Sequence, residues 1–142
     1  MIMKADKGFT FIETIVTISI ILILSAAVGF SAIRYVERAR MAACRNQIET
    51  FRLALQVYYL DCGHYPTEAQ GLQALRERPS IPPVPSGWNG PYLDRQIPLD
   101  PWGNVYVYKN PGDMGLPFTI MSYGADGRPG GEGKNADIYS WQ

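Results

Sequence analysis

The sequence predicts an α+β protein, in which a long amino-terminal α-helix that spans a membrane in its first half packs on a small antiparallel β-sheet. Three observations support this prediction: residues 14–33 carry no charge, residues 41–62 place apolar side chains at helical spacing, and residues 104–109 and 118–123 alternate in the manner of strands. A sheet packed on the apolar stripe of the helix would bury both apolar surfaces. The 142 residues fit one domain of ordinary size.

Residues 14–33 are long enough to cross a bilayer as a helix. Twenty residues at a rise of about 1.5 Å each match a hydrocarbon core of about 30 Å. A cleavable secretory signal is the alternative, but its apolar region has only about 7 to 15 residues, and residues 25–27 resemble its cleavage site only weakly. Basic residues stand on both sides of the segment, so the positive-inside rule leaves its orientation open.

Apolar residues of the next segment step by three and four positions, the spacing of one face of a helix. They are Met41, Cys44, Ile48, Phe51, Leu55, Tyr58 and Cys62. No proline interrupts the chain before them, so one helix is predicted from about Thr10 to Cys62, with Gly63 as its carboxy-terminal cap. This helix would separate Cys44 from Cys62 by about 27 Å, which excludes a disulfide between them. A disulfide between one of these cysteines and another molecule remains an alternative.

A short second helix is predicted after the long one. Thr67 and Gln70 have the spacing of a capping box, in which each side chain bonds the backbone N–H of the other. The helix would continue to about Glu77. Its apolar face would consist of Ala69, Leu72 and Leu75.

The chain beyond this helix predicts a loop and then a hairpin. Residues 79–91 contain five prolines and two glycines, which exclude regular structure, and Trp88 is expected to pin this loop to the domain. Residues 104–109 and 118–123 are the two predicted strands. Residues 110–117 have the glycine and proline content of a connection between them.

Charge and composition exclude several functions. Thirteen basic residues balance thirteen acidic ones without a basic cluster, which argues against a nucleic-acid partner. His64 is the only histidine, and although Cys62 is close in sequence, nothing marks the orienting group and cleft that a Cys–His nucleophile needs. No enzyme is predicted.

Glu13 is the anomaly of the apolar segment, because a lone carboxylate inside a bilayer costs a few kcal/mol unless it reaches water or a cation. Residues 7–13, Lys-Gly-Phe-Thr-Phe-Ile-Glu, resemble the processing site of type IV pilins and type II secretion pseudopilins. The resemblance implies that a prepilin peptidase cuts between Gly8 and Phe9 and that Phe9 is N-methylated. It also implies that the Phe9 ammonium pairs with Glu13 of an adjacent subunit, which would fix the stagger between subunits.

The head resembles the major pseudopilins of type II secretion in the order and spacing of five segments. These are residues 58–61, 65–75, 90–93, 98–104 and 123–127. The implied fold is pilin-like, with a long helix, a small antiparallel sheet and a carboxy-terminal calcium-binding loop. The implied parts are a leader at residues 1–8, a transmembrane and assembly helix at 9–33, and a periplasmic head at 34–142. Phe30 stands where relatives usually carry a proline.

The resemblance places a Ca²⁺ ion in the glycine-rich residues 124–137, which have little backbone order of their own. The implied ligands are the carboxylates of Asp126 and Asp137 and the backbone carbonyls near Tyr123 and Arg128. Oxygen donors of this kind suit Ca²⁺. Asn135 and Ala136 stand where many relatives carry another acidic residue. Without the resemblance, Asp126 followed by glycine is typical of a plain turn.

The resemblance implies a structural subunit that polymerises into the periplasmic pseudopilus and drives export of folded proteins across the outer membrane. Implied partners are further copies of the chain in a helical fibre, the prepilin peptidase, minor pseudopilins and the inner-membrane assembly platform. The chain would cross the bacterial inner membrane once, with its carboxy-terminal head in the periplasm. The alternatives are a minor pseudopilin, a type IV pilin subunit, or a membrane-tethered periplasmic binding module. A tether should tolerate Glu13→Leu, whereas a fibre subunit should not.

Overall fold

The computed structural model describes residues 8–142, without the side chains of Phe30 and Ser31. Residues 1–7 of the predicted leader and the side chain of Phe30 therefore lie outside the described residues. The chain divides into two compact units, the first ending at Arg38 and the second running from Ala39 to Gln142.

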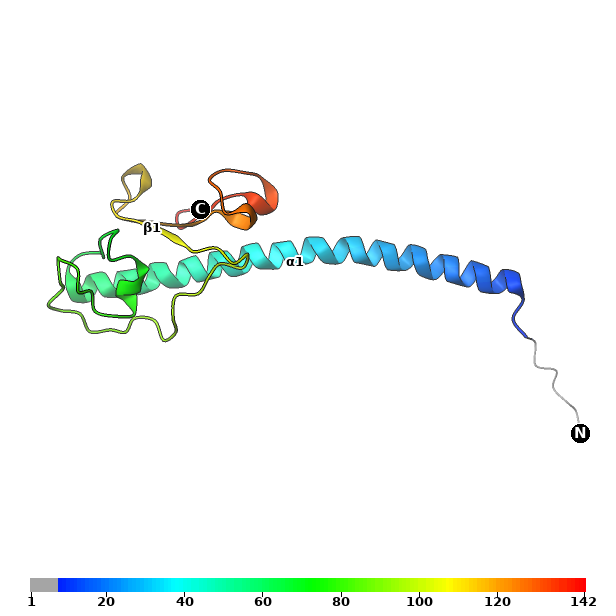
Figure 1. Ribbon diagram of the computed structural model, residues 1–142, viewed down its shortest axis with the longest axis horizontal. Coiled ribbons are helices and arrows are strands. Elements are labelled where there is room, and N and C mark those ends of the chain that lie inside the picture. The colour runs from blue at the N-terminus through cyan, green and yellow to red at the C-terminus, as the bar shows by residue number, and fades with distance from the viewer. Residues whose placement is uncertain (1–7) are drawn as a thin grey trace, which may run out of the picture. The chain divides into compact units, whose positions relative to one another are not determined.

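One helix, α1 (Phe11–Cys62), supplies the regular structure of the first unit and the longest element of the second (Figure 1). It starts one residue after the predicted position and ends where predicted. Gly63 adopts a φ of +76°, and its N–H donates to the Tyr59 carbonyl at 2.8 Å, which closes the last turn. The predicted long helix is therefore confirmed.

The second unit is built around the apolar stripe of α1. Five of the seven predicted stripe residues are buried, namely Cys44, Ile48, Phe51, Leu55 and Tyr58. Met41 and Cys62 are partly buried and pack against the same core. Both cysteines are free, as the helical separation requires. The core also includes Leu72, Leu75, Tyr108, Phe118, Ile120 and Ile138.

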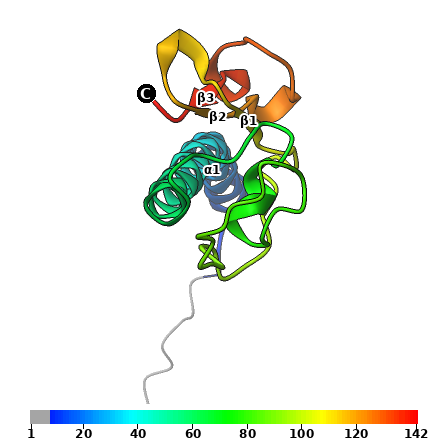
Figure 2. The ribbon, with the colours of Figure 1, turned by 90° about the vertical axis from the view of Figure 1, so that its left-hand side faces the viewer.

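Three antiparallel strands form one sheet in the order β1 (Val107–Lys109), β2 (Thr119–Ser122) and β3 (Ile138–Tyr139). Tyr108 pairs with Ile120, and Met121 pairs with Tyr139. In Figure 2 the sheet lies between α1 and the carboxy-terminal segments. Both faces of β2 are therefore covered, and all four of its residues are buried. The connection at residues 110–117 forms the predicted hairpin.

The first strand is shorter than the predicted residues 104–109. The Asp100 N–H donates to the Asn104 carbonyl at 2.8 Å, and the Asn104 N–H donates to the Asp100 carboxylate at 2.8 Å. These local bonds occupy the backbone of Asn104, which cannot then join the ladder. Val105 is 68% exposed and does not pack into the core.

The predicted helix from Thr67 to about Glu77 is wrong. The capping-box bonds between Thr67 and Gln70 form at 3.0 and 3.2 Å, but only a turn and a short 3-10 helix, η1 (Leu72–Leu75), follow them. Gly71 has a φ of +60°, which stops an α-helix from propagating. Leu72 and Leu75 are buried as predicted, whereas Ala69 is exposed.

The loop at residues 79–91 is irregular, as its prolines predict. The indole N–H of Trp88 donates to the Ala74 carbonyl at 3.0 Å, and its ring packs edge-on against Tyr92. Trp88 therefore pins the loop to the second unit.

Candidate functional site

The amino-terminal site lies where the chain enters α1. Gly8, Phe9 and Thr10 precede the helix without regular structure, and Phe9 is 82% exposed. The Thr10 N–H donates to Glu13 Oε2 at 3.4 Å, and the Glu13 N–H donates to Thr10 Oγ1 at 3.3 Å. These two residues form a capping box that the sequence analysis missed, although a Thr-x-x-Glu string before an apolar run is its signal.

Glu13 is therefore the third residue of the helix as well as the predicted assembly residue. Its carboxylate lies near the positive end of the helix dipole, which favours a negative charge. The cap uses one carboxylate oxygen in a long contact, and Glu13 has no ion pair within residues 8–142. The other oxygen remains available to a cation from outside the chain.

The first unit exposes a continuous apolar surface. Every residue from Phe11 to Gly29 is exposed, and α1 is the one helix among the described residues that is long and apolar enough to cross a membrane. Ile, Leu and Val side chains exposed over this length require lipid or other apolar helices around them.

The carboxy-terminal loop connects β2 to β3 across residues 123–137. It contains two short 3-10 helices, η3 (Gly124–Asp126) and η4 (Gly133–Asn135), which contact each other. A Cβ atom on Gly124 would lie 2.9 Å from the Ala136 carbonyl oxygen. The two ends of the loop are therefore in van der Waals contact, and only glycine fits at residue 124.

The predicted metal ligands differ in their surroundings. Asp137 Oδ2 accepts the Gly130 N–H and the Tyr139 hydroxyl, both at 2.9 Å. Its Oδ1 is buried and has no hydrogen-bond partner in the described structure. A buried carboxylate oxygen without a donor is costly unless a cation meets it. The hydrogen bond to Asp137 raises the pKa of the Tyr139 hydroxyl.

Asp126 has the contacts of a turn. Its Oδ1 accepts the Arg128 N–H at 3.2 Å, and Gly127 follows it with a φ of +65°. The residues whose carbonyls were predicted as ligands, Tyr123 and Arg128, stand at the start of the loop and just beyond this turn. No three His, Cys, Asp or Glu side chains gather anywhere in residues 8–142, so a cation here would need carbonyl oxygens.

A buried polar cluster next to the loop also escaped the sequence analysis. Asp100 is only 4% exposed. Its Oδ1 accepts the N–H groups of Trp102 and Asn104 at 3.0 and 2.8 Å, and its Oδ2 accepts the Ser122 hydroxyl at 2.6 Å. The sequence showed only a turn here, since nothing local marks which carboxylate is buried.

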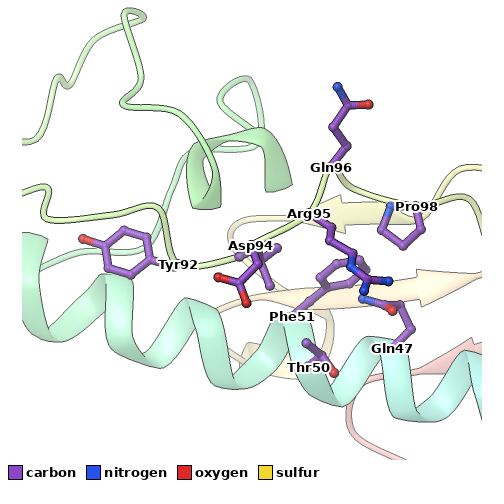
Figure 3. Close-up of a pocket in the computed structure, with 9 residues that line it drawn as sticks. Gln47, Thr50, Phe51, Tyr92, Asp94, Arg95, Gln96 and Pro98 are labelled. Carbon is purple, nitrogen blue, oxygen red and sulfur yellow. The ribbon is translucent and has the colours of Figure 1, made fainter.

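The second unit has an open groove of about 460 Å³ between α1 and residues 92–98. In Figure 3 the Arg95 side chain reaches towards Gln47 on α1, and Gln96 points away. Neither histidine nor cysteine lines this groove. His64 lies elsewhere, with Nδ1 3.0 Å from the Tyr65 carbonyl, and Cys62 Sγ is 4.0 Å from the Tyr92 hydroxyl. The structure does not bring His64 and Cys62 together as a nucleophile pair.

Comparison with known proteins gives concordant matches. Residues 31–141 match the family described as "Type II secretion system (T2SS), protein G", and residues 3–29 match the "Prokaryotic N-terminal methylation motif". The chain is 39% identical to type II secretion system core protein G of Pseudomonas aeruginosa. The match covers 97% of this chain and 96% of the Pseudomonas aeruginosa protein. The chain is 40% identical to the Vibrio cholerae protein of the same name, and that match covers 98% of this chain and 94% of the Vibrio cholerae protein.

A solved structure resembles the fold. The crystal structure of the major pseudopilin from the type 2 secretion system of enterohaemorrhagic Escherichia coli matches with a TM-score of 0.65 and 34% sequence identity. The match covers 75% of this chain and 90% of the other. The predicted architecture, a long amino-terminal helix packed on a small antiparallel sheet, is thereby confirmed.

Proposed function

The chain belongs to the type II secretion system protein G family, and from this premise we propose how each part of it serves the pseudopilus of that system. It is a structural subunit of the pseudopilus, so the resemblance seen in residues 7–13 and in the head is confirmed. The two units have different roles. The first supplies apolar surface for the membrane and for fibre packing, and the second supplies a folded head with its own core.

Processing prepares the first unit for assembly. A prepilin peptidase removes residues 1–8 by cutting between Gly8 and Phe9, and Phe9 becomes N-methylated. The exposure of Gly8 and Phe9, which lie outside regular structure, and the methylation motif at residues 3–29 support this step. The cut creates an ammonium group on Phe9, and methylation keeps its charge.

Assembly then pairs this ammonium group with Glu13 of a neighbouring subunit. The observation that carries the proposal is Glu13 itself, a carboxylate on an otherwise apolar surface with no ion pair in the described chain. The pair would offset the cost of a charge in the bilayer and fix the register between subunits.

The head lies in the periplasm, and the chain crosses the inner membrane once. Addition of subunits at an inner-membrane assembly platform extends the fibre, with minor pseudopilins as further partners, and its growth drives folded proteins across the outer membrane. The exposed apolar surface of residues 11–29 supports the membrane-embedded pool from which subunits would be drawn. The proposal assigns the chain no catalytic step.

The capping box allows a sharp test of Glu13. Glu13→Gln keeps an oxygen that can accept the Thr10 N–H but removes the charge, and Thr10→Ala removes the hydroxyl that accepts the Glu13 N–H but keeps the charge. We expect Glu13→Gln to abolish fibres seen by electron microscopy and Thr10→Ala to retain them. In both variants the Tm of the head should equal that of the wild type. Normal fibres from Glu13→Gln would favour the tethered binding module.

We also propose that the carboxy-terminal loop binds Ca²⁺. The carboxylates of Asp137 and Asp126 and the carbonyls of Tyr123 and Arg128 would hold the ion. The buried, unpartnered Oδ1 of Asp137 supports the proposal, because Ca²⁺ takes about six to eight oxygen ligands in flexible cages. When bound, the ion would neutralise this oxygen and link the two ends of the loop.

The calcium proposal is tested by thermal melts of the full chain in detergent, with CaCl₂ or with a chelator. We expect Ca²⁺ to raise the Tm of the wild type and to have no effect on Asp137→Asn. Asp113→Asn is the matched control, because Asp113 is a surface carboxylate paired with Lys109 at 3.1 Å. It should respond to Ca²⁺ as the wild type does. A wild-type Tm indifferent to the chelator would refute the site.

A further inference from the structure

Gly124 is the second residue of the carboxy-terminal loop, and side chains hold both polar backbone groups of this glycine. Its N–H donates to Ser122 Oγ at 3.1 Å, and its carbonyl accepts the Asn104 amide Nδ2–H at 2.9 Å. Gly124 is buried, with a φ of +66°. The start of the loop is thus held by two contacts from outside the loop.

Both residues that hold Gly124 also bond Asp100, Ser122 through its side chain and Asn104 through its backbone. The Ser122 hydroxyl donates to Asp100 Oδ2 at 2.6 Å, and the Asn104 backbone N–H donates to Asp100 Oδ1 at 2.8 Å. Ser122 is fully buried and Asp100 nearly so. In so buried a position these hydrogen bonds are strong, and the carboxylate leaves each partner few other orientations.

The hold on the Gly124 N–H also sets the direction of a predicted calcium ligand. The N–H of Gly124 and the carbonyl of Tyr123 belong to the same peptide unit, and in a planar trans peptide these two groups point in opposite directions. With the N–H directed at the buried Ser122 hydroxyl, the Tyr123 carbonyl is directed away from that hydroxyl. Rotation of this peptide would break the hydrogen bond to Ser122.

We infer that Asp100 is a positioning residue for the calcium site: through Ser122 and Asn104 it fixes the peptide units on both sides of Gly124 and thereby aims the Tyr123 carbonyl. Asp100 would not touch the ion. The inference rests on the calcium binding proposed above. Its physical basis is pre-organisation, since a carbonyl already oriented before binding need not be ordered by the ion.

Two variants loosen the hold without removing a proposed ligand. Ser122→Ala removes the acceptor of the Gly124 N–H, and Asn104→Ala removes the donor to its carbonyl. Ser140→Ala is the matched control: Ser140 Oγ accepts the Ile120 N–H at 3.1 Å, so its loss also costs strand β2 one hydroxyl contact, but away from Gly124. Asp100→Ala would strand several buried donors and is less informative, because it threatens the fold.

The readout is Ca²⁺ affinity of the full chain in detergent, measured by calorimetric titration with CaCl₂ well below the Tm. We expect Ser122→Ala and Asn104→Ala to raise the Kd about tenfold, equivalent to about 1.4 kcal/mol, and Ser140→Ala to stay within about twofold of the wild type. In the calcium-free chain, amide hydrogen exchange should be faster in residues 124–137 for the two test variants only.

The possible results separate the positioning role of Asp100 from the calcium proposal. Wild-type affinity in both test variants would overturn the positioning role and leave the calcium proposal standing. Equal weakening in all three variants would also overturn it, because a general loss of stability would then explain the result. A wild-type chain that binds no Ca²⁺ would refute the calcium proposal itself, and with it the inference.

Discussion

Two buried tyrosines of the core differ in what their hydroxyl groups meet. The Tyr108 hydroxyl donates to the Pro66 carbonyl at 2.8 Å, whereas the Tyr58 hydroxyl is buried without a hydrogen-bond partner among the described residues. An unpaired buried hydroxyl is costly, while a paired one contributes about 1 kcal/mol. The same chemical change therefore has opposite expected effects at the two positions.

We predict that Tyr58→Phe leaves the free energy of unfolding unchanged or slightly raised, because it removes a polar group that makes no bond. Tyr108→Phe should lower the free energy of unfolding by about 1 kcal/mol, since it removes one of the two hydrogen bonds to the Pro66 carbonyl and leaves the one from the Asn110 amide. Urea unfolding of the full chain in detergent, followed by tryptophan fluorescence, measures both. A larger loss in Tyr58→Phe than in Tyr108→Phe would contradict the assignment.

The same tyrosines predict an alkaline limit to stability. Burial raises the pKa of Tyr58 to about 12, and burial also raises the pKa of Tyr106 and Tyr108. Unfolded tyrosine ionises near about pH 10, so between about pH 10 and 12 the folded state holds protons that the unfolded state releases.

Stability should therefore be complete below about pH 10 and fall as the pH rises towards 12, with Tyr58 alone accounting for up to about 3 kcal/mol. Urea midpoints at about pH 9 and about pH 11 test this. Tyr58→Phe should show a smaller fall than the wild type. Equal midpoints at the two pH values would show that these hydroxyls titrate normally in the folded chain.

At the residue scale, the sequence predicted apolar contacts better than polar ones. The burial of Cys44 and Phe51 follows from periodicity along one helix, which is local. The bonds of Asp100 to Ser122 and of Asn104 to Gly124 join residues 22 and 20 positions apart, and no local pattern marks them. Asp126 and Asp137 came from the family resemblance, and only the structure shows that one oxygen of Asp137 is buried and unpartnered.

At the scale of elements, Gln70 ties the turn after α1 to the proline-rich loop. Its Nε2 donates to the carbonyls of Ile81 and Pro83 at 2.7 and 3.0 Å, and its Oε1 accepts the Thr67 N–H at 3.0 Å. The capping box here serves long-range attachment instead of starting an α-helix, which is why the sequence misplaced an element at this point.

We predict that Gln70→Leu lowers the free energy of unfolding by about 1 to 3 kcal/mol and speeds proteolysis within residues 79–91. Gln73→Leu is the control, because Gln73 is exposed and its side chain has one hydrogen bond among the contacts described, which it donates to the Glu77 carboxylate at 3.1 Å. It should change stability by less than about 0.5 kcal/mol. Limited digestion with a protease of broad specificity, followed by mass spectrometry, measures the rate of cleavage within residues 79–91 in both variants. Equal digestion rates would exclude a tethering role for Gln70.

Element boundaries were predictable where several local signals in the sequence agreed. The α1 helix combines an uncharged run, an unbroken apolar stripe and a terminal glycine, and its predicted bounds agree with the structure. Strand β3 has only two residues in a polar, glycine-rich tail, too few to show alternation. The sequence therefore predicted the two strands of the hairpin but could not locate the third strand of the sheet.

At the scale of the whole molecule, assembly and folding use different residues. The residues that would direct assembly, Phe9 and Glu13, belong to the first unit, whereas the buried core belongs entirely to residues 39–142. The account therefore predicts variants that abolish the fibre without unfolding the head. It also makes processing at residues 8 and 9 the step on which assembly depends, because the cut creates the ammonium group proposed to meet Glu13.

The measurement that tests this most directly is the intact mass of the chain purified from membranes of a host with prepilin peptidase and of a host without it. The account predicts that the first mass lacks residues 1–8 and carries one added methyl group, and that the second is the uncut chain. An uncut chain in both hosts would contradict the account and leave a membrane-tethered head as the better description.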